Sequence, residues 1–269
     1  MSAASGAQRI AEVFAQARRE RRAALMPYLV LGHPTPDESL EMVDAAIAGG
    51  ADMLELGVPF SDPLADGPVI QQATQLALQR GISVARCLAL VAELRQRGAT
   101  LPMVLMGYIN PILAYGEAAF CSACREAGVD GLIVADMPPE EGEVLDTRCH
   151  ENGLALIFLL APTSSPERVR MVCERSQGFV YLVSVTGITG ARDRLSPDLA
   201  AFVSRVRQGT DRPLAVGFGI SNPEQAAEVA KIADGVIVGS ALVDLAGRAN
   251  GHALVRQATR RLRSAVHRG

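Results

Sequence analysis

The sequence predicts an α/β fold, a (β/α)8 TIM barrel with an extra N-terminal helix, and three observations support this class. Eight mostly apolar runs alternate with amphipathic stretches along the 269-residue chain. The runs lack the strict alternation of a half-exposed strand, so they are typical of parallel strands that are covered on both faces. Eight strand–helix units in about 250 residues are the usual content of this barrel.

A doubly wound sheet is the competing architecture. It would more usually contain about six strands and a glycine-rich fingerprint after the first one. In this chain the first apolar run is followed by Gly32-His33-Pro34, which does not match that fingerprint. The sequence therefore favours the barrel.

The predicted elements follow one another without a linker. A helix is expected over 9–22, and strands are expected over 25–31, 51–56, 102–106, 131–135, 154–160, 179–184, 213–216 and 235–238. The intervening helices are predicted over 37–48, 68–80, 84–97, 112–127, 140–151, 166–175, 197–207 and 224–230, with a final pair spanning 241–267. Glycines suit C-caps after several of them: Gly49, Gly98, Gly128 and Gly153. We expect a single domain over 1–269, with residues 1–7 frayed.

Composition excludes several classes of protein. A hydrophobic content of 49% supplies a full core, and the net charge of −3 gives no general attraction to nucleic acid or anionic membranes. No apolar run approaches the roughly 20 residues of a membrane helix, and the N-terminus lacks the pattern of a signal peptide. The 5 cysteines are an odd number in a long chain, which favours reduced thiols and a cytoplasmic location.

The loop after the second predicted strand, 55–68, contains the most distinctive residues. Three prolines within it prevent a helix or a central strand from continuing. Glu55 ends the strand and Asp66 lies at the far side of the loop. An ionised Glu is rarely buried unless it is paired or has a function. Glu55 could therefore pair with an Arg while Asp66 caps the next helix, or both carboxylates could serve a reaction. These two residues alone leave both interpretations open.

Other strand ends carry polar, aromatic or glycine residues, and in a barrel all these ends meet at one rim. The polar and aromatic ones are Tyr108, Asn110, Asp136 and Tyr181. Glycine-rich turns follow the last three strands and contain Gly187, Gly190, Gly217, Gly219, Gly239 and Ser240. Glycines let backbone N–H groups approach an anion, and a helix N-terminus adds a favourable dipole. One such turn could be only a tight turn, but three on one rim favour a phosphate site.

The sequence indicates no metal, imine or redox chemistry. The four histidines form no ligand spacing, and Cys121-x-x-Cys124 has no second pair, which favours two ordinary helix cysteines over zinc or a redox couple. The only lysine, Lys231, falls in a helix rather than at a strand end, which argues against a Schiff base. We therefore expect a small phosphate ester that reacts by proton transfer.

Five motifs, in order along the chain, resemble those of the tryptophan synthase alpha subunit family. They are Glu55-Leu-Gly-Val-Pro-Phe-Ser-Asp-Pro-Leu-Ala-Asp-Gly-Pro68, Met106-Gly-Tyr-Ile-Asn-Pro111, Val129-Asp-Gly-Leu-Ile-Val-Ala-Asp-Met-Pro138, the segment from Tyr181 to Gly190, and Gly217-Phe-Gly-Ile-Ser221. The first is long enough to be highly specific. The resemblance extends over essentially the whole chain from Tyr28 to Ser240 and beyond.

This resemblance implies a lyase that cleaves indole-3-glycerol phosphate to indole and glyceraldehyde 3-phosphate. It implies that Glu55 is the general acid/base and that Asp66 holds the indole N–H. It also assigns substrate contacts to Tyr28, Tyr108, Tyr181 and Thr189, and phosphate contacts to Gly190, Gly217, Gly219, Gly239 and Ser240. The segment from about Val185 to Leu195 resembles the mobile lid of the family.

The resemblance also implies a partner, a beta subunit that carries pyridoxal phosphate and joins indole to serine in an alpha-beta-beta-alpha assembly. The contact residues would be Asp62, Pro63, Asn110 and Pro138. No cofactor is expected in this chain itself. Three residues depart from the common family pattern: His33, Val185 and Tyr28. A stand-alone lyase and a non-catalytic activator of a beta subunit remain alternatives, and the intact Glu55 and Asp66 argue against the activator.

Overall fold

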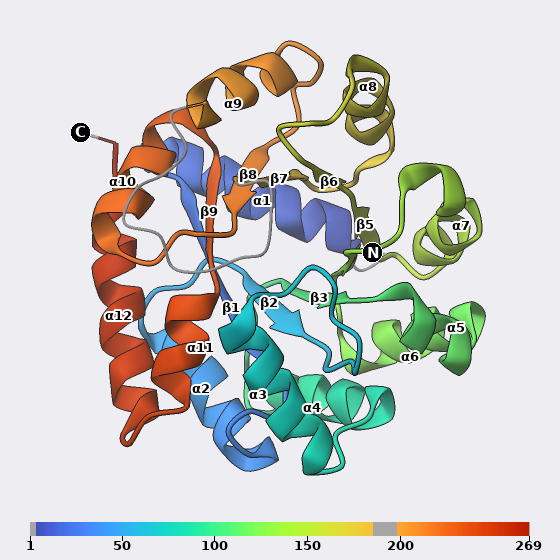
Figure 1. Cartoon of the computed structure of the whole chain (residues 1–269), viewed down its shortest axis with the longest axis vertical. Coiled ribbons are helices and arrows are strands. Elements are labelled where there is room, and N and C mark those ends of the chain that lie inside the picture. The colour runs from blue at the N-terminus through green and yellow to red at the C-terminus, as the bar shows by residue number, and fades with distance from the viewer. Residues whose placement is uncertain (1–3, 185–197, 269) are drawn as a thin grey trace.

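The computed structural model describes residues 4–184 and 198–268, and their strands form a single parallel sheet rolled into a barrel (Figure 1). The strands are β1 (Ala24–Val30), β2 (Leu54–Gly57), β3 (Met103–Gly107), β4 (Gly131–Val134), β5 (Ala155–Ile157), β6 (Leu159–Leu160), β7 (Val180–Val183), β8 (Leu214–Gly217) and β9 (Gly235–Val238). They pair in the order β5-β4-β3-β2-β1-β9-β8-β7-β6. The predicted (β/α)8 barrel is confirmed.

The barrel closes through the chain itself. β5 and β6 are the two ends of the pairing order, and only Phe158 separates them in sequence. The predicted strand over 154–160 is therefore one barrel strand that is interrupted at Phe158, whose N–H bonds the Ser176 hydroxyl at 3.1 Å instead of a neighbouring strand. This interruption explains why nine strands among the described residues correspond to eight predicted ones.

Helices surround the ring of strands, as Figure 1 shows. They are α1 (Gly6–Arg19), α2 (Pro36–Ala48), α3 (Pro68–Gln79), α4 (Val84–Gln96), α5 (Ile109–Tyr115), α6 (Glu117–Ala127), η1 (Pro139–Glu141), α7 (Glu143–Glu151), α8 (Pro166–Arg175), α9 (Leu199–Arg207), α10 (Pro223–Ile232), α11 (Ser240–Ala246) and α12 (Gly251–Ala265). The predicted helix over 112–127 is divided at Gly116, whose φ of 88° suits glycine and breaks the helix. Among the residues described, no helix has the length and apolar character needed to cross a membrane.

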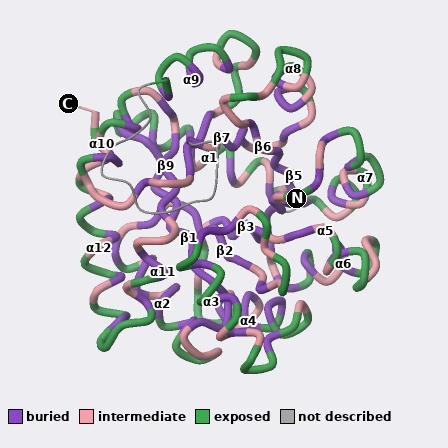
Figure 2. The backbone as a smooth tube through the Cα atoms, viewed as in Figure 1, coloured by how far each residue is buried: buried purple, intermediate pink, exposed green. Residues whose placement is uncertain are grey.

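The first helix lies across the N-terminal end of the barrel. α1 begins at Gly6, because Ser5 and Gln8 form a capping box and the Gly6 N–H bonds the Gly153 carbonyl at 2.8 Å. The prediction that residues 1–7 are frayed is therefore corrected for residues 5–7. Phe14 on this helix packs against Phe179, with ring centroids 5.6 Å apart, just before β7. Figure 2 shows the buried residues concentrated in the strands and on the inner faces of the helices.

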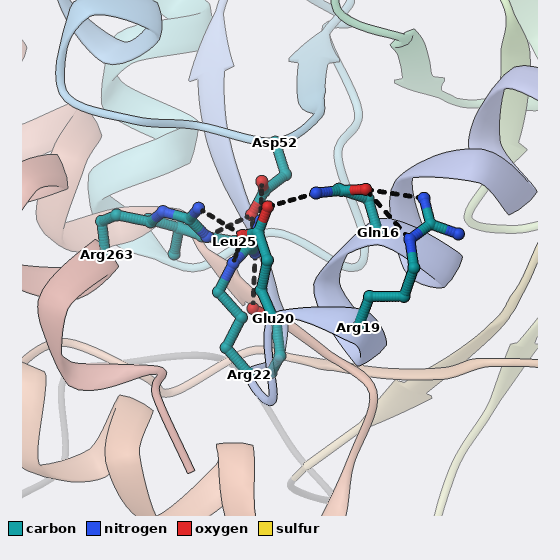
Figure 3. Close-up of polar contacts among 8 residues, drawn as sticks. Gln16, Arg19, Glu20, Arg22, Leu25, Asp52 and Arg263 are labelled. Atoms are coloured by element: carbon teal, nitrogen blue, oxygen red, sulfur yellow. Dashed lines mark hydrogen bonds and ion pairs between the residues drawn. The ribbon is translucent and has the colours of Figure 1, made fainter. Parts of the chain in front are cut away.

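A buried ion network fastens α1, the strands and α12 together at this N-terminal end (Figure 3). Arg22 is 2% exposed and donates to both carboxylate oxygens of Asp52, at 2.7 and 2.8 Å. Asp52 also accepts from the Leu25 N–H at 2.8 Å and from Arg263 of α12 at 3.1 Å. Glu20 completes the network by accepting from Arg22 at 2.6 Å. Residues more than 200 positions apart are thus held at one rim.

The Asp52 contact to a neighbouring strand recurs around the barrel. β2, β4, β7 and β9 are each preceded by a side-chain acceptor that takes a backbone N–H from the preceding barrel strand, which for β7 is the N–H of Phe158 at the interruption between β5 and β6. The pairs are Asp52 with Leu25 at 2.8 Å, Asp130 with Met103 at 2.8 Å, Ser176 with Phe158 at 3.1 Å and Asp234 with Leu214 at 2.9 Å. These bonds join neighbouring strands, so they help to fix the strand register at the N-terminal rim.

Candidate active site

Glu55 lies on β2 inside the barrel, near its C-terminal end. It stands beside Tyr28 of β1 and Val104 of β3 in the register of the sheet. The residue is 3% exposed, and among the described residues neither of its carboxyl oxygens has a hydrogen-bond partner. No Arg among the described residues compensates it, so residues 4–184 and 198–268 give no support to the interpretation of Glu55 as half of an ion pair. A buried carboxyl without a partner is costly when ionised, so this position is a candidate for a functional residue.

The surroundings of Glu55 keep it protonated near neutral pH. Burial, with a smaller contribution from the Asp66 carboxylate, raises the pKa of Glu55 to about 8. A neutral carboxylic acid can donate a proton, and its conjugate base can take one back. The sequence-based expectation of a raised pKa therefore agrees with the geometry.

Asp66 approaches the same pocket from the loop between β2 and α3. It is 6% exposed, its N–H bonds the Pro63 carbonyl at 3.1 Å, and its own carbonyl accepts from Gln71 at 2.9 Å. Burial raises the pKa of Asp66 to about 6, and a hydrogen bond from the Tyr108 hydroxyl opposes that rise. The Tyr108 oxygen in turn accepts from the Ala65 N–H at 3.1 Å. Asp66 is thus mainly ionised at pH 7, when Glu55 is mainly neutral.

Two more tyrosines contribute to the barrel interior beside these carboxyls. Tyr28 and Tyr181 are buried, and burial raises the pKa of each well above its usual value of 10.0. Their hydroxyls occupy the space that a side chain would take at two glycines. A Cβ at Gly57 would lie 2.2 Å from the Tyr28 oxygen, and one at Gly217 would lie 2.1 Å from the Tyr181 oxygen. Both tyrosine rings therefore depend on a glycine at the end of a neighbouring strand.

A pocket with an empty volume of about 370 Å³, part of it open to solvent, unites these groups. Its lining consists of Tyr28, Glu55, Asp66, Ile70, Met106, Tyr181, Phe218, Gly219, Ile237, Gly239 and Ser240. Tyr108 does not line the pocket itself but hydrogen-bonds Asp66, which does. Gly217 is also absent from the lining, because the Tyr181 hydroxyl lies against it. Three of the predicted phosphate residues, Gly219, Gly239 and Ser240, belong to this lining and follow the paired strands β8 and β9.

The sequence-based prediction missed the apolar part of the lining, namely Ile70, Met106, Phe218 and Ile237. Phe218 has a left-handed backbone with φ of 69°, unusual for a residue with a side chain. Its carbonyl accepts from the Ser184 hydroxyl, and its ring meets Tyr181 edge-on with centroids 5.8 Å apart. Met106 and Ile237 could have been found from their places near strand ends. No local signal indicates the backbone of Phe218.

Comparison with known proteins identifies the family to which this site belongs. A family model described as tryptophan synthase alpha chain matches residues 14–267. The chain belongs to the tryptophan synthase alpha chain family. It is 52% identical to the tryptophan synthase alpha chain of Chloroflexus aurantiacus over 236 residues, which cover 88% of this chain and 89% of that one. The alpha chain of Rhizorhabdus wittichii is 46% identical, with 97% of each chain covered.

Solved structures give the same family. A chain of Mycobacterium tuberculosis tryptophan synthase superposes with a TM-score of 0.90 at 41% identity, covering 99% of this chain and 100% of that one. Tryptophan synthase subunit alpha from Legionella pneumophila superposes with a TM-score of 0.87 at 36% identity, covering 96% and 98%. As a member of this family, the protein is a lyase of tryptophan biosynthesis.

The other predicted residues are absent from the pocket lining or lie outside the described residues. Thr189, Gly190 and the predicted lid over 185–195 belong to the part of the chain that the structure does not describe. The predicted partner residues Asp62 and Asn110 are exposed, while Pro63 and Pro138 are partly exposed. Beside them, Leu64 is 85% exposed at the tip of the loop. A groove next to the reaction pocket is lined in part by Leu64, Pro138 and Phe218.

The remaining titratable groups are arranged without a metal site, as far as the described ranges 4–184 and 198–268 extend. All five cysteines are buried and unbonded, and the sulfur atoms of Cys121 and Cys149 lie 4.0 Å apart between α6 and α7. His33, one of the departures from the family pattern, is 8% exposed and faces α11 rather than the reaction pocket. Burial lowers the pKa of His33, so it stays neutral at pH 7.

Proposed function

We propose that the protein cleaves indole-3-glycerol phosphate by a retro-aldol reaction, with Glu55 as the acid/base and Asp66 as the partner of the indole N–H. The observation that supports this most directly is the buried Glu55 carboxyl, which has no hydrogen-bond partner in residues 4–184 and 198–268 and shares a pocket with a second carboxyl group, that of Asp66. The substrate would supply the polar partners that Glu55 lacks. The apolar lining would accommodate the indole ring.

The first step needs an acid at neutral pH. Neutral Glu55, with a pKa of about 8, donates its proton to ring carbon 3, and the ring becomes a cation whose charge is centred on the N–H. Asp66, ionised above a pKa of about 6, accepts the hydrogen bond from that N–H and stabilises the cation. The different pKa values of the two carboxyls thus assign one proton donor and one anion.

The second step needs a base in the same place. Glu55, now a carboxylate, removes the proton of the hydroxyl on the carbon attached to the ring. The carbon–carbon bond breaks, its electron pair returns to the ring, and the hydroxyl carbon becomes the aldehyde. One proton is given and one is regained, so Glu55 ends the cycle protonated and no net proton is consumed.

For the phosphate we propose the part of the lining that follows the paired strands β8 and β9, namely Gly219, Gly239 and Ser240. Gly190 and Gly217 belong to the same proposal, although Gly217 would act by leaving room for Tyr181. Thr189, Tyr28, Tyr108 and Tyr181 are proposed substrate contacts. That the whole chain forms a single domain also remains a proposal.

We further propose that a beta subunit with pyridoxal phosphate binds over the mouth of the pocket, in the cytoplasm and in an alpha-beta-beta-alpha assembly. The exposed positions of Asp62 and Asn110, and the partial exposure of Pro63 and Pro138 on the rim that holds the pocket, support this. Similar solved structures include tryptophan synthase from Mycobacterium tuberculosis in an aminoacrylate-bound form.

The deciding measurement is the release of glyceraldehyde 3-phosphate from indole-3-glycerol phosphate, with and without an added beta subunit. Slow release that the partner accelerates strongly supports the coupled synthase. Fast release that does not respond to the partner supports a stand-alone lyase. If neither preparation released product, the proposed reaction would be wrong, although the barrel and family would stand.

A further inference from the structure

A hollow at the N-terminal rim, remote from Glu55, is lined almost entirely by charged side chains. Its empty volume is about 890 Å³, part of it open to solvent. The lining consists of Arg18, Arg207, Asp211, Lys231, Ile232, Asp234 and Arg268. Four cations against two carboxylates leave a formal charge of +2, in a chain whose net charge is −3. The side chains of the hollow therefore carry a net positive formal charge, opposite in sign to the net charge of the whole chain.

One of its two carboxylates is already neutralised within the fold. Asp234 has a side chain that is only 16% exposed, it accepts from Arg207, and it accepts from the Leu214 N–H at 2.9 Å. Asp234 thus belongs to the repeated strand-joining contacts described above. Arg18 is farther from it, at 3.9 Å, with a side chain that is 73% exposed. Asp211 is then the only carboxylate of the lining left to oppose Arg18, Lys231 and Arg268.

The C-terminal segment positions one of these cations. Residues Arg22 and His267 form an antiparallel bridge, and the Arg268 N–H bonds the Arg21 carbonyl at 2.8 Å. The Arg268 guanidinium then donates to the carbonyls of Ala230 and Ala233, both at 2.7 Å, at the end of α10. Figure 1 shows the C-terminal end of the chain beside α10. Arg268 is therefore held in place rather than free in solvent.

Lys231 is the cation of this hollow whose hydrogen-bond donors are most available to a ligand. It lies in the last turn of α10, it is exposed, and among the described residues it makes no hydrogen bond or ion pair. Cations at helix C-termini offset the helix dipole, which accounts for a basic residue at the ends of α1, α9 and α10. The helix dipole does not explain why the basic residues of these three helix ends line the same hollow as Arg268. An ammonium and guanidinium forks together suit an oxyanion.

We propose that this hollow binds a small oxyanion carrying two or more negative charges, of which pyrophosphate is the simplest probe. The anion would lie among Arg18, Lys231 and Arg268, on the opposite rim from the reaction pocket. This site does not depend on the proposed lyase mechanism, because it shares no residue with the lining of that pocket.

Lys231 makes the proposal directly testable, because it is the only lysine of the chain. The full-length protein is acylated with an amine-reactive ester at constant ionic strength, and modification of Lys231 and of the amino terminus is followed by peptide mass spectrometry. Pyrophosphate at about four times its Kd should slow acylation of Lys231 about fivefold, because a liganded amine is protected. The amino terminus should react at its original rate. Binding at the glycine-rich loops would leave the Lys231 rate unchanged.

Two variants that each remove one positive charge separate a site from general attraction. Arg18→Gln should abolish the protection of Lys231 by pyrophosphate. Arg261→Gln, at an exposed position on α12 outside the hollow, should preserve it. The proposal is overturned if sodium chloride of equal ionic strength protects Lys231 as well as pyrophosphate does, or if Arg261→Gln removes the protection as fully as Arg18→Gln.

Discussion

The carboxyl groups at the two rims of the barrel differ in their hydrogen-bond partners. At the N-terminal rim, Asp52 receives two bonds from Arg22, one from Arg263 and one from a backbone N–H. Asp130 at the same rim receives bonds from Arg9 and Arg95, at 2.6 Å each, and one from the Met103 N–H. At the C-terminal rim, Glu55 receives none among the described residues.

The difference shows how one fold separates stability from chemistry. A carboxylate that accepts from several donors fastens elements together, and removing one member of such a pair leaves the other charge without compensation. A buried carboxyl without donors stays protonated, so it is costly in its ionised form but able to transfer a proton. The barrel places the first kind where strands begin and the second kind where they end.

The largest effect is expected from a substitution of Glu55, the carboxyl at the C-terminal rim, and it concerns the rate of cleavage. Glu55→Gln keeps the size of the side chain but cannot transfer a proton, so cleavage of indole-3-glycerol phosphate should fall by about 10²- to 10⁴-fold. Thermal unfolding at pH 8 should show that the variant is at least as stable as the parent protein, because the amide never ionises. Cleavage within a few-fold of the parent would remove Glu55 from the acid/base role.

The next largest effect is expected from a substitution of Asp52 at the N-terminal rim, and it concerns the free energy of unfolding. Asp52→Asn removes the negative charge that compensates Arg22, which is 2% exposed, and should cost about 3–5 kcal/mol of unfolding free energy. Urea denaturation measures this cost. Asp44→Asn is the matched control, because its pair with Arg97 is solvent-exposed and should contribute less than about 1 kcal/mol. Equal losses in the two variants would contradict the distinction between buried and exposed pairs.

A steric change at the C-terminal rim should have a smaller effect. Gly217→Ala would place a Cβ 2.1 Å from the Tyr181 hydroxyl, and the resulting displacement should cost about 1–3 kcal/mol and reduce cleavage. Gly107→Ala, at the end of β3, is the control, since its Cβ would lie 3.5 Å from the nearest atom. Chemical denaturation and product release report the two consequences. A Gly217→Ala protein as stable and active as Gly107→Ala would show that the fit with Tyr181 is not important.

The smallest effect, and the most specific, is a dependence of stability on pH. The pKa of Glu55 is about 8 when folded against 4.5 in its unperturbed form, so between these values the folded chain holds a proton that the unfolded chain has lost. The contribution of neutral Glu55 to stability is therefore complete below pH 4.5 and is lost as the pH rises to about 8. Near pH 7 the slope should approach about 1.4 kcal/mol per pH unit.

The comparison with Glu55→Gln isolates this slope. Unfolding free energies of both proteins are measured from pH 6.5 to 7.5, above the Asp66 pKa of about 6. The parent should lose stability relative to the variant as the pH rises. If the difference between them stayed constant, the carboxyl would be ionised in the folded protein, and its role as an acid at neutral pH would be lost.

Much of the site could be predicted because its signals are local. The prolines around Asp66 and the glycines after the last strands act on the backbone of the residues that contain them. The sequence also placed Glu55 on the second strand and Tyr108 just after the third, and the structure has Glu55 as the second residue of β2 and Tyr108 directly after β3. The apolar lining was missed because isoleucines, a methionine and a phenylalanine occur equally in a core.

The sequence by itself determined the barrel class, because hydrophobic periodicity and the spacing of turns are properties of short segments. It also determined which carboxyls lie at the rim. Only the tertiary structure decided that Asp52 meets Arg263, that Phe158 interrupts the fifth barrel strand, and that Glu55 finds no partner within the part of the chain that the structure describes. Each of these depends on residues that are distant in the chain, so no local pattern specifies which partner a buried charge finds.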